Sequence, residues 1–70
     1  HPVVQEIKDV IAQLPQVEIT DLHVCKVGKG KFSCILGLET SIADLTPDQV
    51  KRELSIHEEI VHASVEIHHI

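Results

Sequence analysis

Aromatic side chains are nearly absent from this sequence, and their scarcity limits both the core and the partners. Phe32 is the only aromatic residue, and there is no tryptophan, tyrosine or methionine. The core must therefore be built from valine, isoleucine and leucine. Nucleic-acid binding needs aromatic platforms for stacking and a basic surface for the phosphates, whereas the formal net charge is −5. We therefore expect no nucleic-acid partner.

Long hydrophobic runs and a cysteine framework are also missing. No apolar stretch reaches the roughly 18 residues of a membrane span, and no signal peptide is recognisable. Two cysteines in 70 residues are too few for a disulfide scaffold, which favours a reducing compartment. We predict one small soluble domain over residues 1–70. A chain of this length buries only about 60% of its unfolded surface, so a metal or a partner subunit often supports it.

The hydrophobic pattern predicts two helices. Apolar residues recur at spacings of three and four from Val3 to Leu14, which indicates a helix that Pro15 ends. The second helix begins after Thr46, which can cap its first turn, with Pro47 at the first position and Gln49 completing a capping box. We expect this helix to end near Leu54 or Ile56.

A period of two indicates three strands. The first begins at Val17 and forms a hairpin with the segment 31–39 around a Gly28-Lys29-Gly30 turn. We favour a three-residue turn with Gly30 left-handed, because it pairs Val24 with Cys34 and Leu22 with Leu36 on one apolar face. In this register Cys34 is a core residue, Cys25 faces away from it, and no disulfide joins them. The third strand covers about 62–68.

The order helix, strand, strand, helix, strand predicts an α+β fold of two layers, with both helices on one face of a three-stranded sheet. It is a ferredoxin-like arrangement that lacks the usual first strand. The other face of the sheet then carries polar side chains from all three strands. These are Asp21, His23, Cys25, Ser33, Ile35, Gly37, Glu39, His62, Ser64, Glu66 and His68.

Imidazole, carboxylate and thiolate groups gather on this polar face. They are the ligand types of Zn²⁺, Ni²⁺, Co²⁺ and Cu²⁺. Gly37 lies opposite Asp21 in the favoured register, which leaves room above the sheet. Six histidines are many for this length, although His1 is discounted as a terminal residue. The pattern therefore predicts a metal site, while solvated surface histidines are the simpler reading of any one position.

The remaining motifs give weaker indications of function. Cys25 lies in mid-strand without a glycine-rich elbow, and a three-stranded sheet offers little cleft, so we expect no enzyme. The pair Glu58–Glu59 is most simply a solvated loop, to which His57 can add a ligand. The Gly28–Lys31 turn lacks the spacing of a phosphate-binding loop and is read as a hairpin tip.

Two segments resemble the cytoplasmic domains of cation diffusion facilitators. They are Ile19-Thr20-Asp21-Leu22-His23-Val24 with Lys26-Val27-Gly28-Lys29-Gly30-Lys31-Phe32, and the ending His62-Ala63-Ser64-Val65-Glu66-Ile67-His68. The first is similar to the opening hairpin of the branch with an Asp-Leu-His-Val-Trp motif. The second is similar to that branch's final strand, with its His-x-x-x-Glu-x-His pattern. The resemblance covers nearly all of the chain from Asp21 onward.

The resemblance implies a metallochaperone-like domain on the cytoplasmic face of a membrane. Such domains follow six transmembrane helices, form a V-shaped homodimer, and bind divalent metal to favour export by proton antiport. It points to His23, His62, Glu66 and His68 as ligands, with Zn²⁺ the leading ion. Cys25 replaces the usual tryptophan of the branch and adds a soft ligand, which brings Cu²⁺ or a mixed nitrogen–sulfur site into consideration.

Two questions stay open at this level. The ligands can belong to one protomer or be shared across a dimer, and the contributions of His57, His69 and Cys25 are not fixed by the pattern. A non-metal regulatory module of the ACT-like kind shares the same layered architecture, and it would use the open sheet face for dimerisation or for a small ligand.

Overall fold

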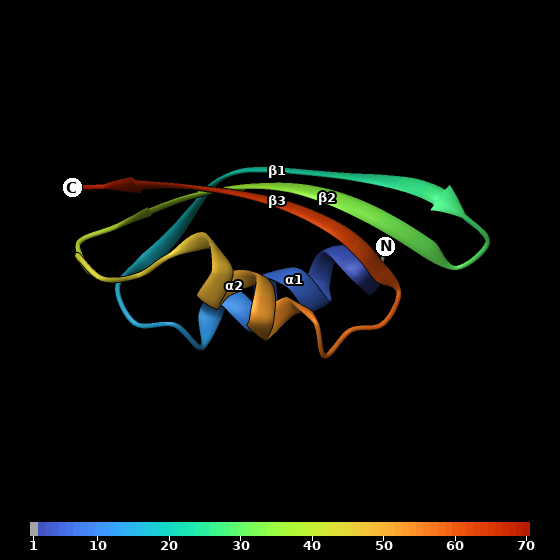
Figure 1. The fold of residues 1–70 in the computed structure, drawn as a ribbon, viewed down its shortest axis with the longest axis horizontal. Helices are drawn as coiled ribbons and strands as arrows, with labels where there is room; N and C mark the ends of the chain where they lie inside the picture. Colours follow the sequence, from blue (N-terminus) through green and yellow to red (C-terminus); the bar gives the residue numbers. More distant parts are fainter. Residues whose placement is uncertain (1) are drawn as a thin grey trace.

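The computed structural model describes residues 2–70, so the terminal His1 lies outside the described residues. Two helices form one layer and a three-stranded sheet forms the other (Figure 1). The elements in chain order are α1 (Pro2–Ala12), β1 (Val17–Gly28), β2 (Lys31–Thr40), α2 (Pro47–Leu54) and β3 (Ile60–His69). This order and the two-layer packing confirm the predicted α+β fold.

Helix α1 covers the sheet with one apolar stripe. Its buried residues are Val3, Ile7, Val10 and Ile11, at the spacings that predicted the helix. The regular helix ends at Ala12, two residues before the predicted end at Leu14. The amides of Gln13 and Leu14 bond to carbonyls three residues back, at 3.2 and 3.0 Å, so the last turn tightens ahead of Pro15.

Helix α2 begins as the sequence predicts. Thr46 is the N-cap: its side chain accepts a hydrogen bond from the Gln49 amide, while the Gln49 side chain accepts one from the Thr46 amide. This reciprocal pair satisfies two amides that the first turn leaves without helical partners. The helix ends at Leu54, the earlier of the two expected ends, and buries Val50 and Leu54.

The register of the β1–β2 hairpin is the predicted one. Val24 pairs with Cys34 and Leu22 with Leu36, and Gly30 has a positive φ of 65°. The detail of the turn differs, because Gly28 itself pairs with Lys31. The residue that shifts the register is instead Val27, which is left over in a β-bulge.

The sheet has the order β1-β2-β3, with β2 in the centre. Strand β3 runs parallel to β2, and it begins two residues before its predicted start. Because a parallel neighbour needs a crossover, α2 returns the chain beneath the sheet before β3 starts (Figure 1). Alternation predicted which residues share a face, but it did not predict this strand order.

The core lies between β2 and the two helices. Leu36 and Leu38 are 0% and 1% exposed, and Cys34 is buried beside them. Thr40 is the one buried polar residue within residues 2–70; its hydroxyl donates to the Gln16 carbonyl at 2.8 Å and accepts from the Ile42 amide at 3.0 Å. The side chains lying against this core from β1 and β3 include Leu22, Val24, Val65 and Ile67. The sheet face that was predicted to pack against the helices therefore does so.

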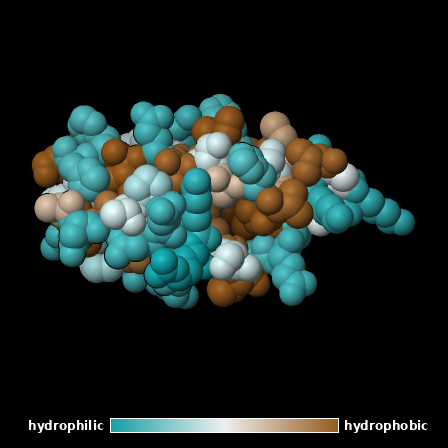
Figure 2. All heavy atoms as spheres, viewed as in Figure 1, coloured by the Kyte–Doolittle hydropathy of each residue, from teal (hydrophilic) through white to brown (hydrophobic). Residues whose placement is uncertain are grey.

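The molecule is elongated, with extents of 37 × 19 × 18 Å. The long axis follows the sheet, and the β1–β2 hairpin extends beyond the helices (Figure 1). Hydrophobic residues also reach the surface in patches among hydrophilic ones (Figure 2). The large exposed ones are Val27, Ile35, Ile56, Val61 and Ile70. Neither α1 nor α2, the helices of residues 2–70, has the length and apolar character that a membrane crossing requires.

Candidate metal-binding face

The sheet face turned away from the helices carries the predicted ligands, and we call it the open face. His23, Cys25, His62, Glu66 and His68 are all exposed there, and each is next to at least one residue that lies against the core. The other members of the open face are Asp21, Ser33, Ile35, Gly37, Ser64 and Glu39. Ile35, at the centre, is 56% exposed.

Strand pairing arranges the open face in rows across the sheet. The rows are Cys25–Ser33–His62, His23–Ile35–Ser64, Asp21–Gly37–Glu66 and Glu39–His68. Residues of β1 and β3 in one row are separated by two strand spacings, about 9.6 Å. Ligand atoms must approach an ion to about 2.0–2.3 Å, so two such side chains share an ion only if they lean toward each other across β2.

Spacing along β3 divides the predicted ligands further. His62 and Glu66 are four residues apart on one strand, which corresponds to about 13 Å. His62 lines a separate hollow of about 180 Å³ between α2 and β3, together with Lys51. Cys25 and His62 therefore mark one end of the open face, and Glu66 and His68 mark the other. Within residues 2–70, none of the five belongs to a group of three whose ligand atoms all lie within 4.8 Å of one another.

One contact on the open face does bring two potential ligands together. Nε2 of His23 lies 2.9 Å from Oδ1 of Asp21, and the two side chains are 64% and 57% exposed. This contact places an imidazole and a carboxylate side by side, both largely exposed to solvent. The sequence interpretation placed Asp21 on this face without naming it as a ligand. The signal was available in its position two residues from His23 on the same face.

The hollow beside Gly37 is where the open face is recessed. It has a volume of about 210 Å³, and its lining residues are Thr20, Asp21, Gly37, Leu38, Glu66 and His68. A β-bulge at Thr20 places two β1 residues against Gly37, so a Cβ there would lie 3.1 Å from both Cβ of Asp21 and Oγ1 of Thr20. The predicted opposition of Asp21 and Gly37 is confirmed, and the hollow holds three carboxylate or imidazole side chains.

The two cysteines have opposite environments. Cys25 is exposed on the open face, whereas Cys34 is 2% exposed in the core. Burial raises the pKa of the Cys34 thiol, because the core disfavours the charged thiolate. Cys25 is therefore the sulfur that a metal ion can reach.

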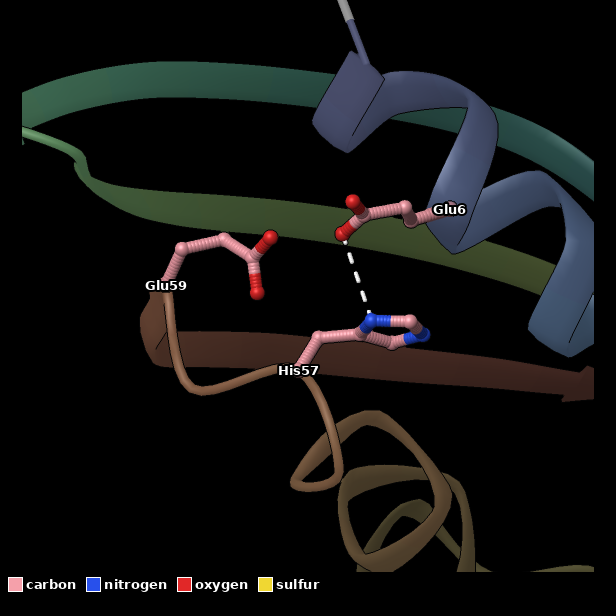
Figure 3. A group of neighbouring side chains, drawn as sticks. All are labelled: Glu6, His57 and Glu59. Carbon is pink, nitrogen blue, oxygen red and sulfur yellow. Dashed lines mark ion pairs between the residues drawn. The ribbon is translucent and has the colours of Figure 1, made fainter.

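A tighter group of ligand-type side chains lies in the helix layer. Glu6 of α1 meets His57 and Glu59 of the α2–β3 loop, and their ligand atoms all lie within 4.8 Å of one another (Figure 3). The sequence interpretation treated Glu59 as part of a solvated loop with His57 as a possible ligand, and it did not include Glu6. No local pattern links Glu6 to the loop, because the two segments are distant in sequence and meet only in the fold.

The fold has close counterparts among solved structures. The nickel form of a single-substitution variant of the C-terminal domain of MamM, a cation diffusion facilitator protein, matches with a TM-score of 0.76 and 15% identity, over 99% of this chain and 96% of that chain. The manganese form of another variant of that domain matches with a TM-score of 0.68 and 14% identity, over 99% and 96%. No protein-family model and no curated protein matches the sequence. At this identity the likeness establishes the fold, which is the fold that the resemblance implied.

Proposed function

We propose that the chain is the cytoplasmic regulatory domain of a divalent-metal efflux transporter of the cation diffusion facilitator family. The observation that carries this proposal is the gathering of imidazole, carboxylate and thiol groups on the one sheet face that no helix covers. The likeness of fold over 99% of the chain to domains studied in nickel and manganese forms supports it.

The proposed ligands are His23, Cys25, His62, Glu66 and His68. Their donor atoms suit Zn²⁺ first, and Cu²⁺, Ni²⁺ or Co²⁺ are alternatives. The β1 and β3 ligands lie on strands about 9.6 Å apart and do not converge within one protomer, and we propose that a second protomer completes the coordination. A homodimer whose open faces or edges approach each other would place ligands from both chains around one ion.

Metal would then act on the distance between the two protomers. Each chain carries a formal charge of −5, so two arms repel each other, and a bridging cation offsets that repulsion. An ion that binds the closed dimer 100-fold more tightly than the open one shifts the equilibrium by about 2.7 kcal/mol. The arms would transmit this change to a membrane domain preceding this one in the same chain.

Calorimetric titration with Zn²⁺ and Cu²⁺ at neutral pH tests the assignment. We expect micromolar binding that a His23→Ala, His68→Ala double variant loses. His69→Ala is the matched control, because His69 is adjacent to His68 but belongs to the other face, where its Nε2 contacts the Leu45 carbonyl at 3.0 Å. Small-angle scattering of the dimer should show a smaller radius of gyration at saturating Zn²⁺.

Unchanged binding in the double variant would contradict the open-face site. Unchanged scattering at saturation would contradict closure by metal. If no binding occurs at all, the ACT-like alternative gains, since Ile35 at the centre of the open face is apolar and 56% exposed, as a dimerisation surface requires.

A further inference from the structure

The group formed by Glu6, His57 and Glu59, which we call the helix-layer cluster, is separate from the open face. Glu6 projects from α1, and the other two side chains come from the loop that leads into β3 (Figure 3). The side chains of His57 and Glu6 are only 26% and 31% exposed. The cluster is therefore partly shielded from water, unlike the solvated histidines on the sheet.

The backbone of the loop is fixed by hydrogen bonds. The Phe32 amide donates to the Glu59 carbonyl at 2.8 Å, which ties Glu59 to the central strand. The His57 amide donates to the Leu54 carbonyl at 3.1 Å, and the Ile60 amide donates to the His57 carbonyl at 3.0 Å.

On the other side of the cluster, Val3 and Ile7 anchor α1 in the core at 1% and 0% exposure. Both segments thus hold their side chains in place before any ligand binds.

The cluster lacks positive charge. Nδ1 of His57 lies 3.2 Å from Oε2 of Glu6, and that oxygen is buried without a hydrogen-bond partner among residues 2–70. In both ion pairs of the described residues the basic partner is a histidine, so no lysine or arginine neutralises Glu6 or Glu59.

The two carboxyl groups move each other's pKa in opposite directions. A hydrogen bond to Glu59, desolvation and the charge of Glu59 raise the pKa of Glu6. A hydrogen bond from its own backbone amide, and then the one from Glu6, lower the pKa of Glu59. Two carboxyl groups this close concentrate negative charge, which a divalent cation would offset.

We propose that Glu6, His57 and Glu59 form a divalent-cation site that is independent of the open face. Two carboxylates and one imidazole suit a first-row ion such as Mn²⁺ or Zn²⁺, with water in the remaining positions. Metal–ligand bonds of about 2.0–2.2 Å place neighbouring ligand atoms about 3.0–3.6 Å apart, and the 3.2 Å separation of Nδ1 and Oε2 already lies in that range. Binding ties α1 to the loop that leads into β3.

Paramagnetic Mn²⁺ locates the site directly in ¹H–¹⁵N spectra of the complete chain. We expect the amide signals of Glu6, His57 and Glu59 to broaden at the lowest Mn²⁺ additions. Glu6→Gln should abolish this broadening, whereas Glu58→Gln, a neighbouring carboxylate outside the cluster, should leave it unchanged. Glu59→Gln repeats the test from the loop, in case Glu6→Gln disturbs α1.

A Zn²⁺ titration separates this proposal from the open-face proposal. The His23→Ala, His68→Ala variant should keep the helix-layer site, and Glu6→Gln should weaken it at least tenfold while keeping any open-face binding. Broadening centred on His62–His68 alone, or broadening that survives both glutamine variants, would overturn the proposal.

Discussion

The two faces of the central strand differ in what they contribute. On the covered face Leu36 is 0% exposed and packs between the helices, whereas its neighbour Ile35 is 56% exposed on the open face. Successive side chains of a strand point in opposite directions, so one strand supplies the core and the candidate site together. Core side chains and side chains of the candidate site thus alternate along β2, and one set can be substituted without changing the other.

The two candidate metal sites differ in how their side chains meet. On the open face, β2 separates the ligands of β1 and β3, and no three of their ligand atoms converge within residues 2–70. The proposed dimer would complete that site. In the helix-layer cluster, an irregular loop after α2 turns His57 and Glu59 back toward Glu6 of α1. The ligand groups of the open face are spread over the sheet, whereas the loop after α2 brings those of the helix-layer cluster close together.

Truncating a buried side chain of β2 should have the largest effect on stability. Leu36→Ala removes a fully buried side chain, which costs about 2–5 kcal/mol. A domain this small has a total stability of about 3–5 kcal/mol, so a large part of the variant should be unfolded at room temperature. Ile35→Ala on the open face should change stability by no more than about 0.5 kcal/mol in dilute protein. Urea unfolding compares the two, and equal losses would contradict the division between the faces.

Thiol labelling should distinguish the two cysteines strongly. Cys25 is exposed and should react at once, whereas Cys34 should react only when the core opens. If opening costs about 3 kcal/mol, Cys34 reacts more than 100-fold more slowly. Mass spectrometry with Cys25→Ser and Cys34→Ser variants assigns the rates. Protection of Cys25 by Zn²⁺ would add direct evidence for coordination, and similar rates for both thiols would contradict the register.

Gly37→Ala should be an exception to the rule that open-face substitutions leave stability unchanged, because this position is tightly packed. The added methyl group would meet Asp21 and Thr20 at 3.1 Å, a distance that forces the bulge to shift. We expect a loss of about 1–3 kcal/mol, with a smaller hollow for Glu66 and His68. Ser33→Ala, on the same face of the same strand, is the control and should be nearly neutral. Equal unfolding midpoints would show that the bulge yields without cost.

Glu6→Gln should have the smallest effect, and it should depend on pH. The raised pKa of Glu6 means that its ionised form is disfavoured in the folded state, so this residue weakens the wild type as pH rises through that pKa. Glutamine cannot ionise. Without metal, the Tm of the variant should therefore rise relative to that of the wild type as pH increases above about 4.5, the ordinary carboxyl pKa. A Tm difference that stays constant with pH would contradict the raised pKa of Glu6.

Local signals in the sequence were enough for most of the fold. Thr46 and Gln49 form the capping box that their spacing predicted, and Gly30 takes the left-handed conformation. The alternation around Leu36 selected the register, because a slip of one residue would expose the core. These features depend on neighbours in sequence or on the requirement that one face be apolar, which a single sequence displays.

The features that escaped prediction depend on distant parts of the chain. Alternation assigns faces but gives no strand order, so the parallel pairing of β3 with β2 was not expected. Alternation also placed the five open-face ligands together without their separations. Glu6 lies on a helix with no local partner, and only the packing of α1 against the loop at His57 and Glu59 reveals the cluster.

The elongated shape has a mechanical consequence. A body 37 Å long and 18–19 Å across acts as a lever when it turns about one end. A rigid rotation of about 15°, the size seen between subunits in allosteric proteins, moves the far end by roughly 10 Å. In the proposed dimer, small adjustments among a few ligand atoms near one end would therefore become a displacement that fluorescence energy transfer between two labelled tips can follow.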